Sequence, residues 1–177
     1  MDPTPPPATP PRRLFRLGRA DDPLAPLPGP PDAAFGGAAV VLCSTRRGAF
    51  VEVLVPSKPG AARTGLPPAA VVVALRFADP RPLLDLRPPL DPAAAAESTL
   101  LPPGGTEVVL RPERWAETFA EAVAAGFAGI AYRSTLAPSQ VCWAVSRDAA
   151  LALLAAPRPV SPHDPDLVAV GRLLDWA

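Results

Sequence analysis

The sequence predicts an α/β (α+β) protein that folds as a single compact domain, with a central mixed sheet and flanking helices. Its 177 residues are enough for one domain with a sizeable core. Hydrophobic residues make up 49% of the chain and fall in short, strand-length blocks between prolines. One longer segment, after Arg111, repeats its apolar residues at helical spacing instead.

Composition narrows the class of protein further. The 28 prolines favour stiff connections, and the apolar blocks between them favour a globular body over a disordered chain. Seventeen basic and seventeen acidic residues cancel, so no global field favours nucleic acid or an anionic membrane. No stretch is apolar over the length of a bilayer, and residues 1–11 do not resemble a signal peptide. We therefore expect a soluble, cytoplasmic protein with no membrane or direct nucleic-acid partner.

The chain divides into three expected parts. Residues 1–13 are expected to be a disordered Pro-rich N-terminus, residues 14–155 the folded domain, and residues 156–177 a Pro-rich linker with a short C-terminal helix.

Within the first half, apolar runs predict strands and turn residues predict loops. The expected strands are Leu14–Leu17, Ala38–Cys43, Ala70–Phe77 and Leu83–Leu86. Ser44 or Thr45 is expected to cap a helix that runs to about Val55. The loops are predicted at residues 21–31 and 56–68, and residues 91–105 are expected to be irregular apart from a helical turn at 93–97.

In the second half, the clearest helix begins at Pro112 and stops at Gly126. Its apolar face carries Trp115, Phe119, Ala122 and Val123. Strands are then expected at residues 129–134 and 140–145, a short apolar helix at Ala149–Ala155, and a helical tail at 167–176.

Most standard catalytic and metal-binding motifs are absent. Neither a dinucleotide-binding glycine motif nor a P-loop, zinc-protease or nucleophile-elbow motif occurs. The single histidine, His163, lies in a Ser-Pro-His-Asp-Pro loop, which argues against Ser-His-Asp catalysis. Cys43 and Cys142 lie in apolar runs and are expected to be reduced core thiols rather than a disulfide. We therefore expect no metal and no bound cofactor.

Three polar residues stand where core residues are expected. Arg16 follows two apolar residues, Glu52 interrupts an apolar helix, and Ser134 ends a predicted strand. Each also has an ordinary explanation, since Arg16 and Glu52 can face solvent and Ser134 can cap the next turn. Their positions alone do not decide between a structural and a functional role.

Four sequence blocks resemble the RES domain family in the order in which that family carries them. They are Leu14-Phe15-Arg16, Gly48 to Val53, Leu84-Asp85-Leu86-Arg87, and Gly126 to Ser134. The family is named for its Arg, Glu and Ser, which correspond here to Arg16, Glu52 and Ser134. The resemblance covers about residues 14–145.

The resemblance implies a minimal relative of the ADP-ribosyltransferase fold and a specific activity. RES proteins cleave NAD+ between nicotinamide and ribose, as glycohydrolases or phosphorylases, and many are bacterial toxins silenced by an Xre-type antitoxin. By this resemblance, Glu52 is the catalytic carboxylate, while Arg16 and Ser134 take part in catalysis and bind the substrate. Arg133 and Arg19 are further expected substrate-binding residues, and NAD+ is a substrate rather than a resident cofactor.

The chain departs from the family pattern at two places. Family members carry a Tyr eleven residues before the Glu, where this chain has Val41, and a second Arg upstream, where residues 29–35 contain none. Arg19 or Arg47 is a candidate to replace that second Arg. These departures keep two alternatives open: a catalytically degenerate RES fold that binds a nucleotide or a partner, and an interaction protein that uses its Pro-rich ends.

Overall fold

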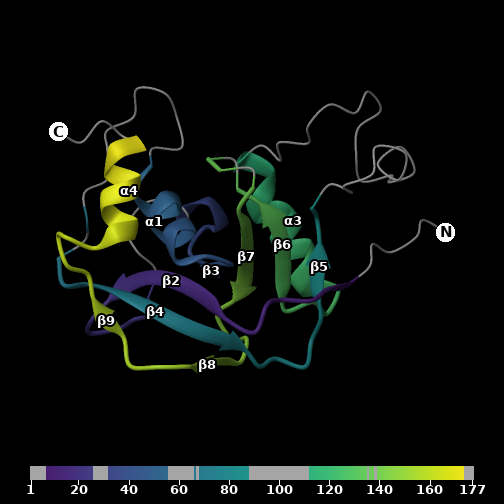
Figure 1. The fold of residues 1–177 in the computed structure, drawn as a ribbon. Coiled ribbons are helices and arrows are strands. Elements are labelled where there is room, and N and C mark those ends of the chain that lie inside the picture. The colour runs from purple at the N-terminus through teal and green to yellow at the C-terminus, as the bar shows by residue number, and fades with distance from the viewer. Residues whose placement is uncertain are drawn as a thin grey trace.

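The computed structural model describes residues 7–25, 32–55, 66, 68–87, 112–134, 136–137 and 139–173. In these residues nine strands form one mixed sheet with three α-helices and a 3-10 helix (Figure 1), which confirms the predicted fold class. The expected loop at 56–68 falls mostly, and the expected irregular stretch at 91–105 entirely, outside the described residues.

The sheet has the order β1-β5-β6-β7-β3-β2-β4-β8, and β9 also pairs with β4. Among the described strands, β5 and β6 pair in parallel, and the other pairs are antiparallel. The strands are β1 (Pro7–Ala8), β2 (Leu14–Arg19), β3 (Ala39–Cys43), β4 (Ala70–Phe77), β5 (Leu83–Asp85), β6 (Gly129–Arg133), β7 (Val141–Ser146), β8 (Leu151–Leu153) and β9 (Arg158–Pro159).

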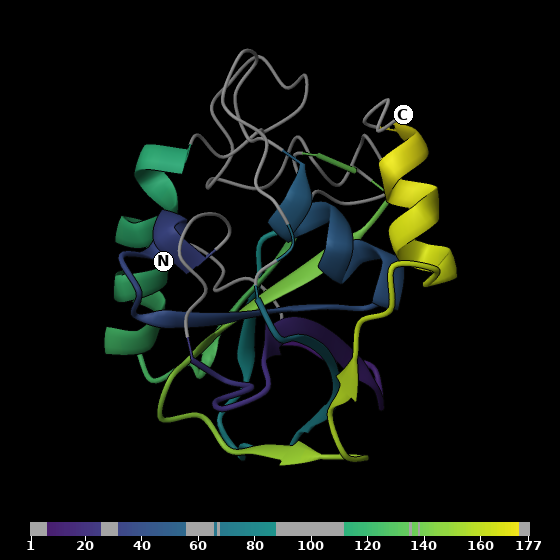
Figure 2. The same ribbon diagram turned by 90° about the vertical axis from the view of Figure 1, so that its left-hand side faces the viewer.

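The helices lie against two different parts of the sheet. Helix α3 (Pro112–Ala124) and the 3-10 helix η1 (Asp32–Phe35) pack beside β6, while α1 (Arg46–Leu54) and α4 (Pro165–Leu173) lie together beside β2 (Figures 1 and 2). Trp115, Phe119 and Ala122 on α3 are buried, as their spacing predicts. The positive φ of Gly126, +90°, ends this helix in a conformation that glycine adopts without strain.

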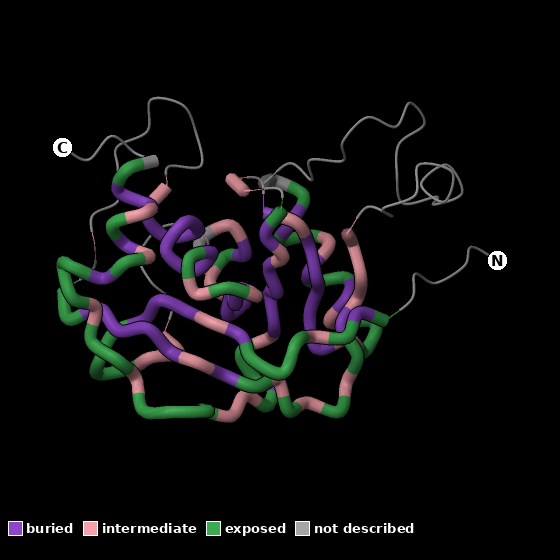
Figure 3. Tube along the Cα trace, in the orientation of Figure 1, coloured by how far each residue is buried: buried purple, intermediate pink, exposed green. Residues whose placement is uncertain are grey.

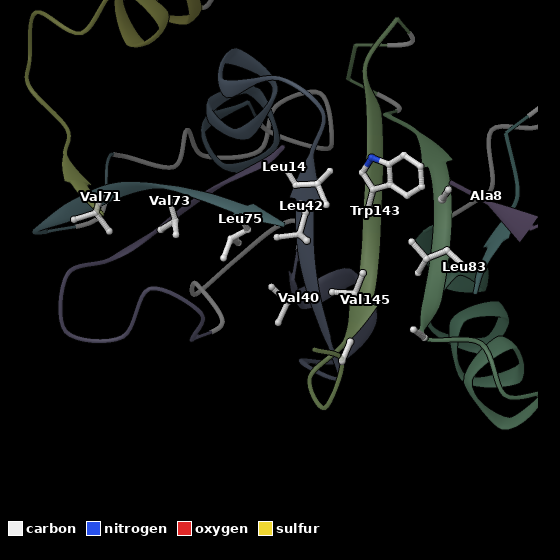
Figure 4. Close-up of a cluster of buried hydrophobic side chains, with 13 residues drawn as sticks. Ala8, Leu14, Val40, Leu42, Val71, Val73, Leu75, Leu83, Trp143 and Val145 are labelled. Atoms are coloured by element: carbon white, nitrogen blue, oxygen red, sulfur yellow. The ribbon is translucent and has the colours of Figure 1, made fainter. Parts of the chain in front are cut away.

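The sheet bends, so that β2 and β4 cross the view in Figure 1 while β6 and β7 stand upright. Alternate residues of each strand therefore point to opposite faces of the sheet and belong to different hydrophobic clusters. The inner curve holds residues such as Val40, Leu42, Val73, Leu75 and Trp143 (Figure 4), and the intervening residues face the helices.

The bend falls at the junction of β2 and β3. These two strands share the single register pair Phe15↔Cys43, whereas β2 pairs with β4 along its whole length from Leu14 to Arg19. Beyond Phe15 the strands β2 and β3 diverge, and Arg16 is the first residue of β2 past that point.

The predicted helix at Ala149–Ala155 is wrong, because Leu151–Leu153 form strand β8 against β4. An isolated helix of seven residues is unstable in water, and the outer edge of β4 offers unpaired peptide groups instead. The ladder continues on both sides, since Ala78 donates to Ala150 (2.8 Å) and Leu154 donates to Ala74 (2.9 Å).

Two short strands lie in the Pro-rich ends, where composition predicts little order. Pro7–Ala8 pairs with β5, and Arg158–Pro159 pairs with β4. Both are edge positions, where proline's missing N–H is tolerated. Among the described helices, none combines the length and apolar character that a membrane-spanning segment needs.

Candidate active site

Arg16, Glu52 and Ser134 are all buried, with exposed fractions of 3%, 6% and 2%. They come from β2, from α1 and from the residue after β6. Burial excludes the solvent-facing placements that the sequence left open for Arg16 and Glu52. These three residues are therefore placed in the interior, although polar groups in such positions carry a desolvation cost.

Glu52 is held by a short helix that is buried on almost every side. Every residue of α1 from Gly48 to Leu54 is buried (Figure 3), since β2 packs on one side of the helix and α4 on another. Thr45 begins the helix, and its hydroxyl accepts a hydrogen bond from the Gly48 amide (3.0 Å). Glu52 is therefore largely shielded from solvent, with 6% of the residue exposed.

The Glu52 carboxylate accepts a hydrogen bond from the Ser134 hydroxyl. Burial raises the pKa of Glu52 above its ordinary value, while the hydrogen bonds from Ser134 and from the Cys142 thiol act in the opposite direction. Since burial is the largest of these effects, the carboxylate holds its proton more tightly than an exposed glutamate does.

Ser134 also closes the loop that follows β6. Its hydroxyl accepts hydrogen bonds from the amides of Leu136 (3.1 Å) and Ala137 (3.0 Å), and its own amide donates to the carbonyl of Gln140 (2.9 Å). The expected turn-capping contact and the contact to Glu52 therefore occur together. This loop fixes the direction of the hydroxyl.

Arg16 fills the gap where β2 and β3 diverge. Its guanidinium donates to main-chain carbonyls of described residues, from Nε to Pro23 (3.3 Å), from Nη1 to Val41 (3.2 Å) and from Nη2 to Ala25 (2.6 Å). These contacts connect β2 to β3 and to the loop after β2. The two strands themselves share only one register pair at this place. Arg16 thereby positions the backbone around the site.

Arg16 and Glu52 line one small cavity. Ser134 is not a lining residue, but its hydroxyl is hydrogen-bonded to the Glu52 carboxylate. The cavity has a volume of about 10 Å³, and its other lining residues are Leu17, Val41, Cys43, Ala49 and Val53. A space of this size holds roughly one water molecule. The three residues named by the sequence therefore converge on one place in the described part of the chain.

The other expected binding residues lie apart from this cavity. Arg19 is about half exposed and pairs with Asp21, from Nε to Oδ1 (3.0 Å) and from Nη2 to Oδ2 (2.5 Å). Arg133 is half-buried at the end of β6 and, by alternation along the strand, shares the face of Ala131. Arg47 is exposed in the first turn of α1. None of these arginines is among the cavity's lining residues.

A comparison with protein-family models matches the RES domain over residues 13–168. The chain belongs to the RES domain family. No curated protein and no solved structure matches it. The expected likeness to ADP-ribosyltransferases therefore stays a prediction.

The RES match spans Arg16, Glu52 and Ser134, and it extends past the expected end of the domain at residue 155 into the first turn of α4. At the position where RES proteins usually carry a Tyr, Val41 lines the cavity beside Glu52. This wall of the site is aliphatic in the present RES domain.

Two cysteines contact this site, which the sequence did not indicate. Cys43 and Cys142 are directly opposite on β3 and β7, with their sulfurs 3.8 Å apart and unbridged. Contact between the sulfurs, desolvation and the nearby Glu52 raise the pKa of Cys142 well above that of a free thiol. Cys142 is therefore a neutral neighbour of the carboxylate. Its position depends on strand register, which the sequence alone does not give.

The sequence also missed Gln140, whose buried side chain joins the start of α1 to the loop after Ser134. The only sequence feature that could have indicated Gln140 is its amide side chain at the start of the otherwise apolar strand expected at residues 140–145.

Proposed function

We propose that this RES domain cleaves NAD+ at the bond between nicotinamide and ribose. The observation that carries the proposal is the buried Glu52 carboxylate, which is bound by Ser134 and shares a cavity with Arg16. Membership of the RES family supports the same assignment.

The proposed reaction breaks the bond between nicotinamide N1 and ribose C1′. Nicotinamide leaves as a neutral base with the bonding electrons, and positive charge develops on the ribose. A fixed carboxylate at position 52 stabilises that charge. Water then attacks C1′ to give ADP-ribose and a proton. Alternatively, phosphate attacks the same carbon to give ADP-ribose that carries a phosphate ester at C1′.

Each of the three residues has a distinct proposed role. Glu52 faces the developing charge, and Ser134 orients Glu52 and binds the ribose or the nicotinamide amide. Arg16 holds β3 and the loop after β2 in place and contacts the pyrophosphate. The last contact requires the nucleotide to bind next to the gap between β2 and β3.

The proposal is tested by incubating the purified protein with NAD+, with and without phosphate, and separating the products by chromatography. We expect wild type to release nicotinamide and Glu52→Gln to lose at least about a hundredfold in rate, because the substitution removes the charge and keeps the shape. Glu117→Gln, on the exposed face of α3, is the matched control and keeps wild-type activity. NAD+ left intact by wild type under both conditions contradicts the proposal.

The aliphatic wall at Val41 favours a second candidate, a RES fold that binds a nucleotide without turnover. An aromatic ring at this position provides a stacking surface worth about 1 kcal/mol, which valine does not. In that case NAD+ raises the melting temperature of the protein while remaining intact.

We further propose that the protein acts in the cytoplasm as the toxin of a toxin–antitoxin pair, with an Xre-type protein as the antitoxin. The support is the RES family alone. Expression of wild type is expected to deplete cellular NAD+ and stop growth, and expression of Glu52→Gln is not. Growth unaffected by an active enzyme contradicts the toxin role but not the reaction.

A further inference from the structure

We propose that Gln140 is a positioning residue that sets the contact between Glu52 and Ser134. It does not line the cavity next to Glu52, and it acts through the helix that carries Glu52 and the loop that follows Ser134. This inference rests on the proposed NAD+ cleavage for its activity readout and on the geometry alone for its structural readouts.

Gln140 is buried, with 7% of the residue exposed, and both the oxygen and the nitrogen of its side-chain amide form hydrogen bonds. Its Nε2 donates to the Ser44 hydroxyl and to the Val141 carbonyl, both at 2.8 Å. Its Oε1 accepts a hydrogen bond from the Thr45 hydroxyl at 2.5 Å. The amide therefore fixes the two residues that precede α1.

The Thr45 hydroxyl links this network directly to the helix. It accepts the Gly48 amide and donates to Gln140, so one group both caps α1 and bonds the loop. Glu52 lies one turn after Gly48 on the same helix. Any shift of the first turn of α1 relative to the loop is passed to the carboxylate, because helices move as rigid units.

The main chain of Gln140 holds Ser134, the hydrogen-bond partner of Glu52. The Gln140 carbonyl accepts the Ser134 amide at 2.9 Å, and the Gln140 amide donates to Ala137 at 2.7 Å. The loop from residue 134 to residue 140 is therefore closed at Gln140. Through its side chain and its main chain, one residue determines the spacing between Glu52 and Ser134.

Gly48 completes the arrangement by letting the amide approach the helix. A methyl group on Gly48 would overlap the Cδ and Oε1 atoms of Gln140. The amide cannot swing away freely, since Ser44, Thr45 and Val141 hold it. Glycine is costly inside a helix, so this close packing is the reason for a glycine at this position.

The first test measures stability in a double-mutant cycle and needs no enzymatic activity. Gly48→Ala is expected to lower the melting temperature in wild type, because the methyl group displaces Gln140. In the Gln140→Ala background the same change is expected to raise the melting temperature, since the space is then free and alanine favours the helix. If Gly48→Ala changes the melting temperature by the same amount and in the same direction in both proteins, the proposed contact between Gly48 and Gln140 is wrong.

The second test measures kinetics with Gln140→Leu, which keeps the bulk and removes every polar contact of the side chain. We expect kcat to fall about tenfold to a hundredfold with KM changed by less than about threefold, because the reacting groups are misplaced by a fraction of an ångström. The acid limb of the kcat profile is expected to move to higher pH, as Glu52 loses part of its bond from Ser134. Leu83→Val, which loosens the core around β5 away from α1, is the control for lost stability and keeps both readouts.

Failure of this inference is distinguishable from failure of the proposed function. If wild type cleaves NAD+ and Gln140→Leu keeps its kcat and pH profile, the positioning role is wrong and the reaction stands. If wild type does not cleave NAD+, the pKa of Glu52 is measured by carbon-13 NMR, with its carboxyl signal assigned by its loss in Glu52→Gln. An unchanged pKa in Gln140→Leu overturns the inference, and a raised pKa supports it.

Discussion

Glu52 stands in an environment that opposes its ionisation. Burial raises its pKa, so the folded protein binds this proton more tightly than the unfolded chain does. The resulting stability is complete below the ordinary pKa of glutamate and is lost as the pH rises through the raised value. Above the raised pKa, the ionised carboxylate therefore lowers the free energy of unfolding.

At the residue scale, this predicts that Glu52→Gln is more stable than wild type at neutral pH, because the amide keeps the shape without the buried charge. The melting temperature is expected to rise by a few degrees at pH 7, and the difference to shrink at about pH 4, where wild type is protonated. Thermal denaturation of both proteins at the two pH values measures this. A variant less stable than wild type at pH 7 would show that the contacts of the carboxylate outweigh its burial.

The sequence identified Arg16, Glu52 and Ser134 as candidate site residues, but it could not predict where their side chains lie. A polar residue in an apolar run is compatible with an exposed or a buried side chain, and only the family resemblance favoured Arg16, Glu52 and Ser134. Their convergence depends on the gap between β2 and β3 and on the loop after β6. Neither feature has a local sequence pattern, and for the same reason Gln140 was missed.

At the element scale, α4 is joined to α1 by charge. The Asp164 carboxylate accepts the Asp166 amide at the start of α4 (3.1 Å), and Arg46 of α1 donates to both Asp164 and Asp166. Burial opposes the ionisation of Asp164, but Arg46 and the backbone amides outweigh it and lower its pKa. The stability that this carboxylate contributes is therefore lost as the pH falls below the ordinary range of aspartate.

Two substitutions separate the cap from the ion pair. Asp164→Ala is expected to cost about 1–2 kcal/mol, because it removes the cap of α4 as well as the ion pair. Asp164→Asn is expected to cost less, about 1 kcal/mol or below, since asparagine caps a helix equally well and the lost pair is partly exposed. Urea denaturation at neutral pH measures both. Equal losses in the two variants would contradict a capping role.

Elements with strong local signals were predicted from the sequence, and those decided by neighbours were not. Thr45 as a cap, the face of α3 and the run from Ala70 to Phe77 were confirmed. The residues of β8 were predicted as a helix, because a short apolar stretch fits either structure until a partner strand is known. Strand β1 has no sequence signal and exists only beside β5.

At the scale of the whole molecule, the bent sheet concentrates the core on its inner curve and leaves its β8 edge open. Leu75 and Leu153 are direct partners across the β4–β8 ladder, yet they are 0% and 54% exposed. We expect Leu75→Ala to cost about 2–5 kcal/mol and Leu153→Ala less than about 0.5 kcal/mol. Chemical denaturation of the two variants measures the difference. Similar losses would place β8 inside the core.

The proposed reaction requires a nucleotide to bind and react where β2, α1 and the loop after β6 meet. A crystal structure of Glu52→Gln with NAD+ tests this most directly, because the inactive variant preserves the substrate. We expect the ribose C1′ beside residue 52, with Ser134 within hydrogen-bond reach of the ribose or the nicotinamide and Arg16 next to the pyrophosphate. A nucleotide bound on another face, or no binding at a saturating concentration, would contradict it.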